Sequence, residues 1–72
     1  MARVAAIGEA PRVQGLGLAG VLVLPAEDAE QVRARWSSLP ADVAVVVLTP
    51  RASDALVGRP RTGDRLTVVM PP

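Results

Sequence analysis

The sequence predicts one α/β domain, spanning residues 1–72, in which short helices connect the strands of a four-stranded parallel sheet. Two observations predict this class. Four short apolar runs are spaced along the chain with helix-compatible segments between them, and the runs are continuous rather than alternating with polar residues. Strands that alternate with helices favour parallel pairing through right-handed crossovers.

The first half of the chain contains two of these runs. Residues 3–7 are predicted to form a strand that is buried on both faces, and residues 21–24 a second buried strand. The segment between them, residues 10–18, predicts a weak helix. It should be short or irregular, because Gly15 and Gly17 each cost about 1 kcal/mol relative to alanine inside a helix.

Residues 26–39 predict the longest helix. Acidic residues lie near its start and arginines near its end, which complements the helix dipole. Trp36, the single aromatic residue, falls on its apolar face and is expected to pack in or against the core. The predicted apolar face consists of Ala29, Val32, Trp36 and Leu39.

The last third of the chain contains the most hydrophobic run, residues 43–48, which we expect to be a central strand. Thr49 suits the N-cap and Pro50 the first position of a short helix over residues 51–57. After a Gly/Pro-rich loop, residues 66–70 are predicted to form the last strand. Together the elements predict a three-layer Rossmann-like domain with the flavodoxin-like strand order 2-1-3-4.

The composition excludes several kinds of site. The chain has no cysteine and no histidine, which removes disulfides, the common zinc sites, cysteine nucleophiles and histidine general bases. Eight arginines and seven acidic residues give a net charge of +1, so there is no electrostatic basis for binding nucleic acid or an anionic membrane. Arg59, Arg61 and Arg65 form the closest basic group, and we predict a solvated loop there rather than a phosphate site.

No uncharged run approaches the ~20 residues of a membrane span. The N-terminus also lacks the long apolar region of a signal peptide. We therefore expect a cytoplasmic location without direct insertion into a membrane.

Three glycines, Gly15, Gly17 and Gly20, match the letters of the dinucleotide motif G-x-G-x-x-G. In a dinucleotide site this motif directly follows the first strand and opens a helix. Here the first predicted strand ends at Ile7 and a strand follows Gly20, so we predict no such site.

The phosphoryl receivers share this kind of fold, but their chemistry is also not expected here. A receiver needs an acceptor aspartate after the third strand and acidic Mg²⁺ ligands after the first. The chain has Leu48–Thr49 and a lone Glu9 at these places, and Glu9 is predicted to be a solvated or helix-start charge. No serine or threonine has a histidine partner. The prediction is a non-enzymatic protein without a cofactor or a metal.

Four blocks of the sequence resemble those of a known family. They are residues 4–9 (VAAIGE), 13–21 (VQGLGLAGV), 45–49 (VVVLT) and 66–71 (LTVVMP). In this order they are similar to the blocks of the F subunit of the V/A-type (vacuolar/archaeal-type) ATPases and ATP synthases. Leu16 stands where the family usually has phenylalanine, and Gly17 where it often has a polar residue. The family's C-terminal helix has no counterpart up to Pro72, so the resemblance is to a form lacking that helix, either a chain cut at this point or a short member of the family.

The resemblance implies a non-catalytic central-stalk (rotor) component of a proton- or sodium-translocating complex. Such a protein docks on the D subunit of the central stalk, and through it communicates with the catalytic A/B head and the membrane rotor, to couple and stabilise rotation. We expect Leu16, Leu18 and Arg51 to bind the partner, because they flank the carboxyl ends of strands, where such folds usually bind. The alternative is a free-standing flavodoxin-like regulatory module that binds a small ligand or another protein.

Overall fold

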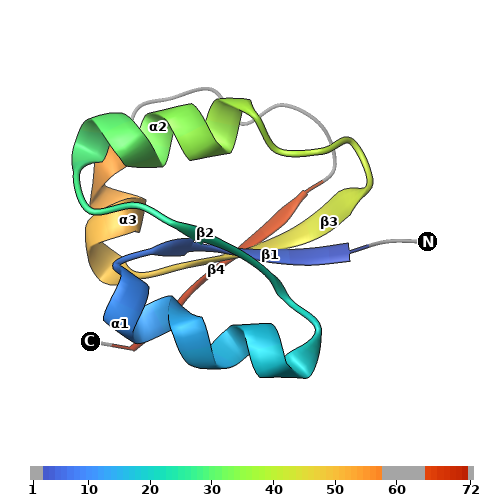
Figure 1. The fold of residues 1–72 in the computed structure, drawn as a ribbon. Helices are drawn as coiled ribbons and strands as arrows, with labels where there is room; N and C mark the ends of the chain where they lie inside the picture. The colour runs from blue at the N-terminus through green and yellow to red at the C-terminus, as the bar shows by residue number, and fades with distance from the viewer. Residues whose placement is uncertain (1–2, 58–64, 72) are drawn as a thin grey trace.

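The four strands form one sheet, in which all neighbours are parallel and the order is β2-β1-β3-β4 (Figure 1). The structure, a computed structural model, describes residues 3–57 and 65–71. The strands are β1 (Arg3–Gly8), β2 (Leu22–Pro25), β3 (Val43–Leu48) and β4 (Leu66–Val69). The predicted fold class and strand order are therefore confirmed.

The helices cover the two faces of the sheet unequally. The α2 helix (Ala29–Ser37) and the α3 helix (Pro50–Ala55) lie on one face, and α1 (Ala10–Val13) with the 3₁₀ helix η1 (Gln14–Ala19) on the other (Figure 1). Right-handed crossovers dictate this arrangement, because the chain moves from β1 to β2 in one direction and then returns past β1 to β3 and β4.

The core lies between the sheet and the α2/α3 layer. It is built from aliphatic side chains, as the composition predicts, and Trp36 packs against it half-buried. One part of the predicted α2 face is wrong, because Ala29 is exposed, whereas Val32 is buried. The buried cluster contains Ala5, Ile7, Ala26, Val32, Val43, Val46, Leu48 and Ala52.

The helices start and end where local hydrogen bonding allows. The α2 helix begins at Ala29 rather than Ala26, because the Asp28 carboxylate caps it by accepting from the Gln31 N–H at 2.8 Å. Ala26 is instead held at the sheet by its N–H bond to the Gly8 carbonyl, 2.8 Å. The predicted weak helix is irregular as expected: a single α-turn continues as η1 and ends at Gly20, whose φ of 82° favours glycine.

Two expectations about exposure are corrected. The predicted second buried strand, β2, is only half-buried, because it is an edge strand. Arg65 is not a solvated loop residue: it is half-buried and donates hydrogen bonds to the carbonyls of Val43 (3.1 Å) and Pro40 (2.8 Å), which ties β4 to the α2–β3 connection. Arg59 and Arg61 lie outside the described residues.

Within the described residues no helix is long and apolar enough to cross a membrane. The longest, α2, has nine residues and is about 14 Å long, against a hydrocarbon core of about 30 Å.

Candidate functional site

The carboxyl ends of β1 and β3 form the point where the chain leaves the sheet toward opposite faces. From β1 the chain enters α1, and from β3 it enters α3 on the other side (Figure 1). In open parallel sheets the crevice at such a switch point is the usual place for a ligand. A functional site is therefore expected there first.

The floor of this crevice is filled by Thr49. Its side chain is fully buried and packs directly on Gly8 of the neighbouring strand. A β-carbon at Gly8 would overlap the Cγ2, Oγ1 and Cβ atoms of Thr49, so only glycine allows this close approach. The volume over β1 and β3 nearest the sheet is thus occupied by protein.

The polar groups of Thr49 are all used inside the chain. Its hydroxyl oxygen accepts from the Ala52 N–H at 3.3 Å and so caps α3, as predicted from the sequence. The hydroxyl also lies 3.1 Å from Glu9 Oε1, to which it donates. Glu9 stands at the start of α1, as one of the two expectations had it, but it is half-buried and bonded to Thr49 rather than freely solvated.

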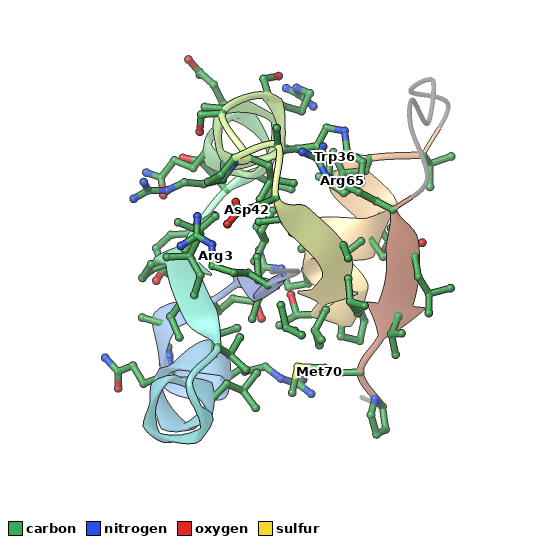
Figure 2. All side chains as sticks on the ribbon, turned by 90° about the vertical axis from the view of Figure 1, so that its right-hand side faces the viewer. Arg3, Trp36, Asp42, Arg65 and Met70 are labelled. Atoms are coloured by element: carbon green, nitrogen blue, oxygen red, sulfur yellow. The ribbon has the colours of Figure 1, made fainter. Side chains whose placement is uncertain are left out.

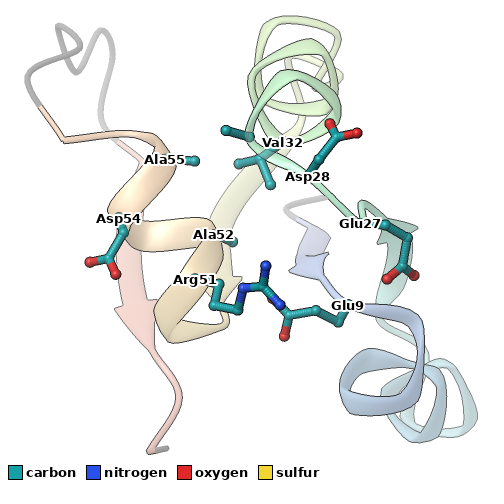
Figure 3. A pocket seen from close by; sticks show the side chains of 9 residues that line it. Glu9, Glu27, Asp28, Val32, Arg51, Ala52, Asp54 and Ala55 are labelled. Atoms are coloured by element: carbon teal, nitrogen blue, oxygen red, sulfur yellow. The ribbon is translucent and has the colours of Figure 1, made fainter.

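Above this floor a cavity of about 320 Å³ opens between α2 and α3 (Figure 3). Val32 and Ala52 contribute to its apolar wall, and charged side chains surround its mouth. In Figure 3 the Arg51 side chain extends from α3 toward Glu9 on the opposite side. The charged residues that line the cavity are Glu9, Glu27, Asp28, Arg51 and Asp54.

This charge pattern is poorly suited to phosphate, since four carboxylates face one guanidinium. Two of the carboxylates already have backbone partners: Glu27 accepts from the Ala10 N–H at 3.0 Å and Asp28 from the Gln31 N–H at 2.8 Å. Within the described part of the chain no group of three or more acidic side chains is arranged to hold a metal ion. The cavity thus has room for a small molecule but no assembled phosphate or metal site.

The structure separates the three residues predicted to bind a partner. Arg51 lies at the carboxyl edge and lines the cavity. Leu16 lies in η1, half-buried, on the opposite face of the sheet. Leu18 also belongs to η1, and its side chain is outside what the structure describes. The expectation that all three flank the carboxyl edge is wrong, because η1 runs back from α1 toward the start of β2.

A second candidate surface lies on the α1 side of the sheet. The helices of this side, α1 and η1, pack on β1 and β2. The strand register aligns Val4 of β1 with Val45 of β3 and Leu66 of β4, and the next row on this side joins Ala6, Val47 and Val68. Ala6 is fully buried, but the other five are exposed or half-buried. We call these five side chains the open face: Val4, Val45, Val47, Leu66 and Val68.

The most exposed side chains of the open face belong to β4, the reddish strand at the right of Figure 2. Val4 is 36% exposed, Val68 45% and Leu66 60%. The sequence predicted β4 as a strand but not its exposure, because an edge strand and a central strand can have the same apolar composition. The missed signal is the lack of a predicted helix that could cover β3 and β4 on this side.

Comparison with known proteins adds no assignment. The chain matches no protein-family model and no curated protein. The resemblance of the four sequence blocks therefore stays a prediction.

Proposed function

We propose that this protein is a non-catalytic docking subunit, and that it acts as the central-stalk F subunit of a V/A-type ATPase or ATP synthase. In this role it binds the D subunit on the cytoplasmic side of the membrane and turns with it. The open face is the observation that carries the proposal. Parallel sheets occur almost only with both faces covered, so exposed Leu66 and Val68 favour a partner that completes the layer.

The carboxyl edge supports the same role. A domain of this class that used nucleotide phosphates would need space and donors over the ends of β1 and β3. Here Thr49 occupies that space, and the Glu9 carboxylate beside it repels an anion. The proposed mechanism is mechanical: apolar contact with the stalk fixes the domain on the rotor, and the compact sheet transmits load without chemistry.

Binding to the cognate D subunit tests the proposal. The two purified proteins should form a complex at micromolar concentration, measured by isothermal titration calorimetry and size-exclusion chromatography. Because the contact is apolar, we expect a negative heat-capacity change on binding. A lack of any complex at that concentration would contradict the stalk assignment.

The cavity between α2 and α3 favours a second candidate function, a regulatory module that binds a small ligand. Its volume, about 320 Å³, lies at the lower end of the range of ligand pockets, about 300–1,000 Å³. A thermal-shift screen with nucleotides, flavins and small cationic metabolites tests it, since a ligand that binds only the folded chain raises the melting temperature. The shift should disappear in Arg51→Ala or Asp54→Ala if the ligand occupies this cavity.

A further inference from the structure

Resting on the proposed function, we infer that the open face binds one amphipathic α-helix of the partner, whose apolar stripe is flanked by acidic side chains. The helix lies beside α1 and η1 and completes their layer. The size of the surface, its position next to α1 and η1, and its charge lead to this occupant.

The open face has the dimensions of one helix. It spans β1, β3 and β4, and three neighbouring strands at about 4.8 Å spacing cover about 10 Å, which matches the diameter of a helix. Since α1 and η1 pack on β1 and β2, a helix over β3 and β4 lies about 10 Å from them, the usual interaxial distance. The two side-chain rows then contact residues spaced i, i+3, i+4 and i+7 on the incoming helix.

The charge on the α1 side of the sheet favours acidic side chains beside the apolar stripe of that helix. Arg12 is the only charged residue of α1 and η1, and the described strand residues of the open face are all apolar. Its guanidinium donates to the Pro71 carbonyl at 2.6 Å, so a positive charge stands at the carboxyl end of β4, beside the open face. Acidic flanks on the partner complement this charge.

The positive charge of Arg12 also disfavours a second copy of this chain as the occupant of the open face. In a symmetric pair, the α1/η1 layer of one copy would fill the open face of the other and bring two Arg12 side chains toward the same contact. None of the acidic side chains of the described residues belongs to α1, η1 or the open face, so this layer of a second copy would bring no acidic side chain to the surface.

Paired variants of β4 test the surface. The double variant Leu66→Ala/Val68→Ala removes open-face side chains, whereas Val57→Ala/Val69→Ala removes side chains that are exposed elsewhere. Val69 is the matched control, because it is 50% exposed and points to the opposite side of the same strand. In titrations with the D subunit, we expect the first variant to bind at least about tenfold more weakly and the second within about twofold of the wild type.

Methyl NMR on the wild-type protein gives a second measurement that does not depend on a variant that folds. On addition of the D subunit, the methyl signals of the open face should shift or broaden first. Arg12→Gln should weaken binding a few-fold at low salt and reduce its salt dependence. If the D subunit binds but the control variant loses affinity and the open-face variant does not, the inference is overturned and the stalk assignment stands.

If the D subunit does not bind, the stalk assignment fails and the surface is tested alone. Two synthetic helical peptides with the same leucine stripe, one with glutamate flanks and one with lysine flanks, are titrated into the labelled protein. Selective shifts of open-face methyl groups by the glutamate peptide support the inference. Equal shifts with the lysine peptide, shifts elsewhere, or a dimer that buries these methyl groups would overturn it.

Discussion

The two faces of the sheet use the same kinds of residue for different purposes. On the α2/α3 side, Ile7, Val46 and Leu48 are at most 2% exposed and belong to one cluster. On the α1 side, Val4 of β1 is 36% exposed, and Val68 and Leu66 of β4 are 45% and 60% exposed. The difference lies in the number of helices, since two pack on the first side and one irregular segment packs on the second.

This comparison separates stability from binding. Burial of aliphatic side chains stabilises a fold by about 25 cal/mol per Å² of apolar surface removed from water, so the α2/α3 side should supply most of the stability. Exposed apolar side chains add little to the isolated chain, but they contribute when a partner covers them. A chain of 72 residues has a small stability margin, so burial of these side chains by the proposed partner would add significantly to it.

The largest expected effect comes from a buried side chain on the covered side. Ile7→Ala should reduce the free energy of unfolding by about 2–5 kcal/mol, because it leaves a cavity in the core. Leu66→Ala on the open face should cost less than about 1 kcal/mol. Urea unfolding followed by circular dichroism measures both, and similar losses in the two variants would show that the open face is covered in the free protein.

The next effect concerns the contact between the two central strands. Gly8→Ala should destabilise the fold by about 1–3 kcal/mol, because the new β-carbon overlaps the buried Thr49 side chain. Gly15→Ala is the matched control, since nothing lies within 4 Å of its added β-carbon, and it should be neutral or stabilising by up to about 1 kcal/mol. Combining Gly8→Ala with Thr49→Ala should recover part of the lost stability. If it recovers none, the overlap with Thr49 is not the cause of the loss.

A smaller effect is expected from the polar groups of Thr49. Thr49→Val keeps most of the packing on Gly8 but removes the cap of α3 and the bond to Glu9, at a cost of about 1 kcal/mol. Glu9→Ala removes only the bond between Glu9 and the hydroxyl, so the difference between the two variants isolates the cap. Thermal unfolding of both variants measures how much the cap and the bond to Glu9 each contribute to stability. Thr49→Ser, which keeps the hydroxyl, is the control.

The sequence predicted the sheet better than its surroundings, for physical reasons. Continuous apolar runs identify parallel strands, and the N-cap at Thr49 with Pro50 after it identified the start of α3. The start of α2 was placed too early, because its acidic first residues also suit the connection before a helix. The N–H of Ala26 bonds to the carbonyl of Gly8 in β1, which keeps Ala26 out of the helix. Asp28 therefore caps α2 instead of lying within it.

The candidate surfaces were harder to predict, because they depend on contacts that are distant along the chain. Glu9 and Thr49 are 40 residues apart, and no local pattern in the sequence links the acid to the hydroxyl. Arg65 appeared in the sequence as a loop charge, yet carbonyls 22 to 26 residues earlier hold it. The open face likewise appears only when register aligns Val4, Val45 and Leu66 across three strands.

The smallest expected effect lies at the amino ends of β1 and β3, where an exposed ion pair joins the two strands. Arg3 Nε donates to Asp42 Oδ2 at 2.7 Å, and its NH2 group donates to Oδ1 at 3.1 Å (Figure 2). These hydrogen bonds lower the pKa of Asp42 below its ordinary value. Both side chains are nearly half exposed, 46% and 48%, so solvent and salt weaken the pair.

The sign of its pH dependence follows from that shift. Because the pKa of Asp42 is lower in the folded than in the unfolded chain, the pair stabilises the fold above the unfolded pKa, and this contribution is lost as the pH falls through the folded pKa. Asp42→Asn should therefore be slightly less stable than the wild type at neutral pH and equal to it in strong acid. Urea midpoints across this range, with a carboxyl NMR titration of Asp42, measure the effect. A difference that persists in strong acid would mean that the carboxylate contributes through packing rather than through its charge.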